Sequence, residues 1–138
     1  MKLKSTIQLP IRVMIVGVID YEKDHIEDVF SDKNGFDLIE MIGEFDRFTK
    51  EIVIEKIRNL NIDVTFVDRS IGRSQSIGLV CGINIALPDT NIIVLCEVNE
   101  VAWVYEISKC GVVPILNKPI EIDFLNDAMN VLLGKSKA

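Results

Sequence analysis

The sequence predicts an α/β protein in which five parallel strands form one doubly wound sheet, with about five helices covering both faces. Short β-branched runs alternate along the chain with segments of helical apolar spacing, and turn residues separate them. Near-continuous apolar strands are typical of parallel sheets that are covered on both sides. Right-handed crossovers then favour the strand order 2-1-3-4-5 for a chain of this size.

The five strands are predicted where apolar runs end in turn or polar residues. They comprise residues 11–16, 36–42, 64–67, 91–96 and 112–116. The fourth run is the most continuous and should lie inside the sheet. Pro114 interrupts the fifth run, and a proline suits an edge strand because it cannot donate a hydrogen bond to a neighbour.

Helices are predicted between these strands from apolar residues that recur at helical spacing. Asp20 is expected to cap the first helix, in which Ile26, Val29 and Phe30 recur, and the others span about 48–60, 76–87, 99–110 and 122–133. The expected inward faces are Phe48, Ile52, Ile54 or Glu55, Ile57 and Leu60 in the second helix, and Phe124, Leu125, Met129, Leu132 and Leu133 in the last. With no repeat or linker, residues 1–138 are expected to form one domain with its core at about 11–133.

Composition limits the classes of partner and compartment. Hydrophobic residues make up 49% of the chain, which is typical of a folded globular domain. The net charge of −6 argues against direct binding to nucleic acids or anionic membranes, which favour basic surfaces. Cys81, Cys96 and Cys110 form neither a disulfide framework nor a zinc pattern, so a reducing cytoplasm is expected. No signal-peptide stretch and no membrane-length apolar run are present.

Two charged side chains are predicted to meet at one edge of the sheet. Asp68 ends the third strand and Lys118 follows the fifth, and the carboxyl ends of parallel strands share the edge where ligands collect. Together with Lys118-Pro119 and the turn Lys109-Cys110-Gly111, this pattern resembles the receiver domain of two-component response regulators over nearly the whole chain. The resemblance implies a flavodoxin-like fold, Asp68 at the phosphoacceptor position, and Lys118 and Cys96 at positions that contact the phosphoryl group.

Several positions depart from the receiver pattern. Gly17 and Val18 replace the acidic pair that holds magnesium, and neither offers an oxygen ligand. Cys96 replaces a serine or threonine, Ile115 replaces the aromatic switch residue, and Ile71-Gly72 replaces Met-Pro. Glu97 adds negative charge where a phosphoryl group would arrive. The chain therefore resembles a degenerate pseudo-receiver that needs no cofactor. Mg²⁺ is expected only if Asp68 is phosphorylated.

Each candidate residue also has a structural interpretation. Asp68 either caps a loop and pairs with Lys118, or serves as an accessible phosphoacceptor. Cys96 is expected at the edge of the core, although a nearby Lys118 would lower the pKa of its thiol. Asp20 and Glu22 either cap the first helix or rebuild a metal site, and His25 is expected on the surface.

The predicted fourth helix is apolar on almost every side. Its residues Val101, Trp103 and Tyr105 are candidates for an interface on the face of helix four, strand five and helix five. The resemblance supports this expectation, because receiver domains often dimerise through that face. Packing in the core of a monomer is the alternative interpretation.

Three hypotheses for function follow. The first is a phosphorylation-independent receiver-like module, not an enzyme, that acts through a protein partner or a homodimer, with an output or ATPase domain beyond this chain. The second is an active response regulator that a histidine kinase phosphorylates on Asp68. The third is a small flavodoxin-like enzyme or ligand-binding domain that reuses the cleft.

Overall fold

Five parallel strands form a single sheet in the order β2-β1-β3-β4-β5. The computed structural model describes residues 9–18, 20–97, 100–111 and 114–137, without the side chains of 133–137. The strands are β1 (Ile11–Val16), β2 (Phe36–Ile42), β3 (Val64–Asp68), β4 (Asn91–Cys96) and β5 (Ile115–Asn117). This order confirms the predicted doubly wound fold.

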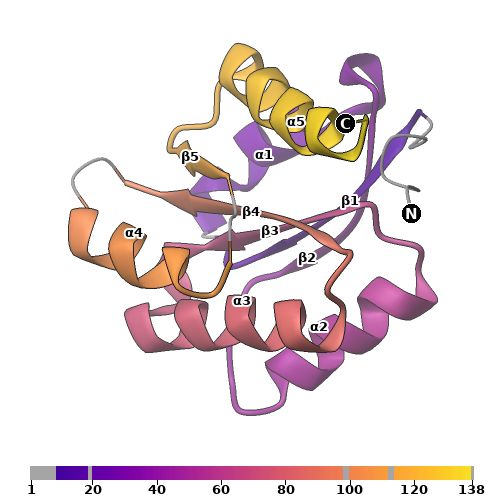
Figure 1. Ribbon diagram of the computed structural model, residues 1–138. Helices are drawn as coiled ribbons and strands as arrows, with labels where there is room; N and C mark the ends of the chain where they lie inside the picture. The colour runs from indigo at the N-terminus through magenta and orange to yellow at the C-terminus, as the bar shows by residue number, and fades with distance from the viewer. Residues whose placement is uncertain (1–8, 19, 98–99, 112–113, 138) are drawn as a thin grey trace.

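Helices cover both faces of the sheet (Figure 1). They are α1 (Lys23–Val29), α2 (Thr49–Asn59), α3 (Arg73–Ala86), α4 (Val101–Ser108) and α5 (Ile122–Lys137), with single 3-10 turns η2 (Asp20–Glu22), η3 (Asp32–Asn34) and η4 (Arg69–Ile71). Helices α1 and α5 lie on one face, and α2, α3 and α4 lie on the other. At the β5 edge, α4 and α5 therefore approach the sheet from opposite sides.

The core has two halves because successive strand residues point to opposite faces. Val13 and Ile15 of β1 pack on the α1 and α5 side, whereas Met14 and Val16 pack on the α2, α3 and α4 side. On the first side Phe30 is central, since its ring meets those of Phe36 and Phe66 edge-on with centroids 5.2 and 4.9 Å away. Such aromatic contacts add to the apolar area that they bury.

One predicted strand boundary and one predicted helix cap need correction. The fifth strand begins at Ile115, because Pro114 lies before it and residues 112–113 fall outside the described residues. Asp20 does not cap the first helix. It lies in η2, and the N-cap residue of α1 is Glu22, whose side chain makes no capping hydrogen bond. The predicted start of helix four at Asn99 also falls outside the described residues.

The predicted inward faces of two helices are partly wrong. Phe48 and Ile52 are exposed, whereas Ile57 is buried as predicted, together with Thr49 and Val53. Residues 52–54 are all apolar, so periodicity alone did not identify the inward one. In α5, Phe124 is 60% exposed while Leu125, Met129 and Leu132 are buried; the side chain of Leu133 lies outside the described part.

The predicted absence of disulfides is also wrong. Cys81 on α3 and Cys110 after α4 form a disulfide whose Cα atoms lie 4.8 Å apart. The two residues are 29 positions apart, and only the packing of α4 beside α3 brings them together. Cys96 remains a free, buried thiol.

Within the described ranges, every helix is too short or too polar to cross a membrane.

Removing the Phe30 ring should destabilise the fold. Phe30→Ala empties a site that is 1% exposed, so we expect a loss of about 3–5 kcal/mol in the free energy of unfolding by urea denaturation. Phe124→Ala is the matched control, because the same atoms are removed from a ring that is 60% exposed. Equal losses in the two variants would contradict the assignment of Phe30 to the core.

Candidate functional site at the carboxyl edge of the sheet

Asp68 lies at the end of β3, where its carboxylate is almost completely enclosed. Its side chain is 3% exposed, and both oxygens have partners. Oδ1 accepts a hydrogen bond from the backbone N–H of Ser70 at 2.9 Å, and Oδ2 accepts one from Lys118 Nζ at 3.0 Å. The first bond arises because Asp68 is the N-cap residue of η4. The loop-capping and Lys118-pairing roles that were predicted for Asp68 therefore occur together.

Lys118 is the cation at the centre of a small cluster of carboxylates, of which Asp68 is buried and Glu97 is largely exposed. It follows β5, and its side chain is 7% exposed. Its Nζ lies 3.0 Å from Asp68 Oδ2, 3.2 Å from Glu22 Oε2 and 3.9 Å from Glu97 Oε2. Three elements that are distant in sequence therefore meet on one ammonium group: β3, η2 and the end of β4. The three carboxylates and one ammonium group leave a formal charge of −2.

Burial and charge act differently on the two central groups. Burial raises the pKa of Asp68 above its ordinary value, while the Ser70 N–H and Lys118 oppose this shift. Burial lowers the pKa of Lys118, but its contacts with Asp68 and Glu22 outweigh burial and leave that pKa raised. The upward pKa shifts of Asp68 and Lys118 are compatible. Lys118 contacts several carboxylates, whereas Asp68 has one cation beside it and little contact with solvent. The cluster thus holds the lysine firmly in its charged form.

The position of the expected acidic pair is closed by packing. Gly17 has a φ of +104°, and a Cβ atom there would lie 2.8 Å from Ile71 Cγ2 and 2.9 Å from Asp68 Cβ. The Ser70 hydroxyl donates to the carbonyl oxygen of Gly17 at 2.7 Å and holds η4 against the end of β1. A side chain at position 17 therefore has neither a suitable backbone conformation nor space. Val18 is half-buried and packs against the α1 and α5 side of the core.

Metal ligands do not converge at this site. Among the described residues, no three His, Cys, Asp or Glu side chains are placed to hold a metal ion. Glu22 contacts Lys118 and Asp20 lies on the exposed part of η2, so the two do not rebuild the acidic pair. Magnesium prefers an octahedral set of hard oxygens, which the described side chains around Asp68 do not provide.

Cys96 and Ile115 lack the chemistry of the residues that they replace. Cys96 Sγ lies 3.7 Å from Asn117 Oδ1, and burial followed by the charges of Glu100, Asp68 and Glu97 raises the pKa of its thiol. Lys118 does lower the pKa of this thiol, as suggested, but burial and the three carboxylates outweigh it, so the net shift is upward. Ile115 is 38% exposed on β5.

The candidate interface residues of α4 divide into two groups. Trp103 is 2% exposed, and its indole N–H donates to Ser76 Oγ of α3 at 2.7 Å, so its prediction as an interface residue is wrong. Its amphipathic ring fits the core because a buried hydroxyl satisfies the N–H. Val101 and Tyr105 remain exposed, at 77% and 64%. His25 is on the surface, where Nε2 lies 2.8 Å from the carbonyl oxygen of Ile120.

Some residues of the site were not recognised from the sequence. Glu22 was considered only as a cap or a metal ligand, although it shares Lys118 with Asp68. Ser70 and Ile71 close the end of β1, and the one available signal was an apolar residue inside a polar loop. Arg69 adds an ion pair from η4 to Glu100, at 3.1 Å, next to the start of α4.

The strand order and the enclosed acid at the end of β3 define a doubly wound α/β protein of the flavodoxin-like type. Comparison with solved structures identifies the fold more narrowly. The signal receiver domain of a modulated diguanylate cyclase from Desulfovibrio desulfuricans G20 matches with a TM-score of 0.73 and 18% identity over 94% of this chain and 98% of that one. A response regulator from Thermotoga maritima matches with a TM-score of 0.71 and 24% identity over 92% and 99%.

The receiver domain of Francisella response regulator 1452 also matches, with a TM-score of 0.68 and 22% identity over 91% of this chain and 98% of that one. No protein-family model and no curated protein matches the sequence. The chain therefore has the fold of response regulator receiver domains, as its sequence resemblance implied.

Removing the cation of the cluster should be costly at neutral pH. Lys118→Met leaves Asp68 buried and facing Glu22 without compensation, so we expect a loss of about 3–5 kcal/mol in the free energy of unfolding. The folded-state pKa of Asp68 then rises further above its unfolded value, and the folded protein binds more protons than the unfolded chain between those values. Stability of the variant should therefore fall as pH rises, and its deficit should shrink from about pH 7 to about pH 5.

Asp68→Asn is the control for this charge balance. It removes the buried negative charge and leaves Lys118 paired with Glu22, so we expect a smaller loss, about 1–3 kcal/mol. Urea denaturation of both variants and the parent protein at each pH gives the comparison. A Lys118→Met deficit that is smaller than that of Asp68→Asn, or that does not change with pH, would contradict the proposed electrostatics.

Proposed function

We propose that this chain is a receiver-like signalling domain that works without phosphorylation, through contacts with another protein molecule. The observation that supports this most directly is the enclosed Asp68 carboxylate, with one oxygen on Ser70 and the other on Lys118. A phosphoacceptor must present an oxygen to its donor. Here Lys118 would have to leave first, while Glu22 and Glu97 retain it.

The charge balance also argues against phosphorylation. A phosphoryl group brings a charge of about −1.5 to −2 at neutral pH. The cluster already carries more carboxylates than cations, and the Gly17 position cannot add a metal ligand. Phosphoryl transfer depends mainly on neutralising charge and positioning the groups, so the site lacks its principal requirement. We therefore propose no enzymatic activity and no resident cofactor.

The β5 edge is the best surface for a protein contact. Five large apolar side chains are exposed there: Val101, Tyr105, Ile115, Phe124 and Val131. Between β5 and α5 lies a groove of about 530 Å³, lined in part by Ile115, Phe124 and Val131. Exposed apolar patches rimmed by polar residues often mark interaction sites on proteins.

We propose a second copy of the chain as the occupant of this surface. Charges of both signs flank the apolar residues, with Lys109 stacked on Tyr105 beside α4 and with Glu121 and Asp127 lining the groove of α5. In a two-fold interface, the α4 side of one copy would lie against the α5 side of the other. Lys109 would then pair with Glu121 or Asp127. A separate protein partner, or an output or ATPase domain beyond this chain, would use the same surface. We propose the cytoplasm as the compartment because of the receiver fold, since the Cys81–Cys110 bond removes the argument from cysteine spacing.

Phosphorylation is tested with acetyl phosphate and Mg²⁺, followed by intact-mass spectrometry. We expect no gain of a phosphoryl group under conditions that label a receiver domain with a complete acidic set, because Asp68 is enclosed and lacks a metal. Asp68→Asn is the matched control for labelling at other residues. A phosphoryl group that appears on the parent protein and disappears in Asp68→Asn would instead establish the phosphoacceptor alternative, with a histidine kinase as the partner.

Self-association is tested by sedimentation at several concentrations. Phe124→Asp places a charge in the apolar groove, so we expect the dimer dissociation constant to rise about tenfold or more. Phe48→Asp is the matched control, because Phe48 is exposed to a similar degree at the start of α2. A parent protein that stays monomeric throughout the range would remove the homodimer. Equal weakening by both variants would move the interface elsewhere.

A further inference from the structure

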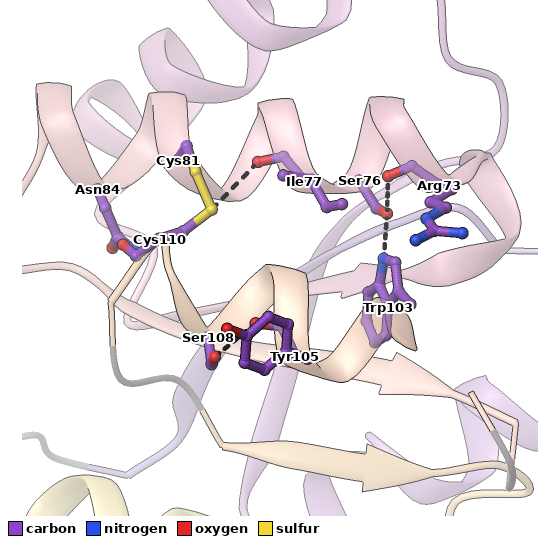
Figure 2. The surroundings of a disulfide bond; sticks show 9 residues. All are labelled: Arg73, Ser76, Ile77, Cys81, Asn84, Trp103, Tyr105, Ser108 and Cys110. Carbon is purple, nitrogen blue, oxygen red and sulfur yellow. Dashed lines mark hydrogen bonds between the residues drawn. A yellow bond between two sulfur atoms is a disulfide. The ribbon is translucent and has the colours of Figure 1, made fainter. Parts of the chain in front are cut away.

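The packing of α4 against α3 follows one line of contacts along α3 (Figure 2). Near the start of α3, Arg73 Nε donates to Glu106 Oε1 at 2.6 Å, and the Ser76 hydroxyl accepts from Trp103. Near its end, Cys81 forms the disulfide with Cys110. The contacting residues of α3 recur at helical spacing, so they share the face that meets α4. The disulfide is the single covalent contact in this row.

The surroundings of the disulfide suit the reduced state as well. Its Cα separation of 4.8 Å lies in the usual range for a disulfide. Cys110 Sγ lies 3.6 Å from the carbonyl oxygen of Ile77, which would accept the proton of a Cys110 thiol. Asn84 Nδ2 donates to the carbonyl oxygen of Cys110 at 2.8 Å and holds this turn in either state. Reduction therefore leaves no buried group without a partner at Cys110.

Solvent exposure distinguishes Cys81 and Cys110 from Cys96. Cys81 and Cys110 are partly exposed, whereas Cys96 is 2% exposed within the core. Thiol–disulfide exchange requires approach of a small thiol or disulfide to a sulfur atom, so access controls its rate. Cys110 also lies between the end of α4 and the segment that leads to β5. A bond at this point determines how firmly the carboxyl end of α4 is held.

We propose that Cys81 and Cys110 are a reversible redox site that fastens the carboxyl end of α4 to α3 when oxidised and releases it when reduced. The oxidant is a small disulfide such as oxidised glutathione. One thiolate attacks its S–S bond and expels one glutathione. The second thiolate then attacks the mixed disulfide, forms the Cys81–Cys110 bond and expels the other glutathione. Two protein thiols are oxidised, and one glutathione disulfide is reduced to two thiols.

This inference does not depend on the proposed partner surface or on Asp68. It concerns a modification site between α3 and the turn after α4, whereas Tyr105 belongs to α4 itself (Figure 2). After loss of the bond, α4 and the turn that follows it keep polar contacts with α3. These include the exposed Arg73–Glu106 pair, which contributes little, the buried Trp103–Ser76 hydrogen bond and the Asn84–Cys110 hydrogen bond. We therefore expect reduction to loosen the carboxyl end of α4 more than the rest of the fold.

The full chain is equilibrated in glutathione buffers of graded ratio, trapped by alkylation and analysed by mass spectrometry, with amide hydrogen exchange measured on the same samples. We expect the Cys81–Cys110 bond to form and break reversibly across the series. Amide exchange at the end of α4 should speed up at least about tenfold on reduction, because a crosslink of this span usually restricts the opened chain by more than that factor. Exchange in α1 should not change.

Two variants complete the test. Cys81→Ser should show the fast α4 exchange in every buffer, and Cys96→Ser should respond as the parent protein does. The proposal would be overturned if both thiols remained free under fully oxidising buffer, or if Cys110 paired only between molecules. It would also be overturned if the bond resisted excess dithiothreitol in the folded protein, or if α4 exchange were the same in both redox states. All four of these outcomes are measured on the parent protein. The test therefore does not depend on whether each variant folds.

Discussion

The contact between Lys118 and the carboxylates around it is the interaction on which this edge of the molecule depends. Without Lys118, the ends of β3 and β4 and the turn η2 would bring Asp68, Glu97 and Glu22 together with no lysine to compensate their charge. A buried pair of this kind contributes little to net stability compared with apolar packing, but losing one member leaves an uncompensated charge. The Lys118–carboxylate contacts therefore maintain the geometry of the site because removing one partner costs free energy. Their formation itself adds little to the stability of the fold.

The packing at the end of β1 also works against a metal site beside Asp68. Ile71 and Ser70 occupy the space beside Gly17, so the region around Asp68 is closed by packing on one side and by Lys118 on the other. Restoring a metal site would require more than an acid at position 17, because the backbone there has a φ of +104° and η4 would have to move. The packing of Ile71 against Gly17, the Ser70–Gly17 hydrogen bond and the Lys118–Asp68 pair are therefore mutually compatible.

The sequence predicted the sheet and the Asp68–Lys118 contact because both follow from apolar runs and from the shared edge of parallel strands. It failed where neighbouring positions were chemically similar or where tertiary packing decided. Ile52, Val53 and Ile54 are equally apolar, and only contact with the sheet selected Val53. Trp103 was placed on the surface because of its residue type, whereas the hydroxyl of Ser76 made burial possible. The Cys81–Cys110 pair has no sequence signal, since the two sulfurs meet only after α3 and α4 pack together.

Helix α4 is held by three kinds of chemistry, which respond to different conditions. The Arg69–Glu100 ion pair sits beside its start and would weaken with salt, because both groups are partly exposed. The Trp103–Ser76 hydrogen bond is buried, so neither salt nor pH near neutrality should change it. The Cys81–Cys110 bond responds only to thiol exchange. Asp68 is enclosed, and β5 carries Ile115 where the receiver pattern has an aromatic residue. These features support our proposal that α4 is controlled through its own attachments rather than through phosphorylation of Asp68.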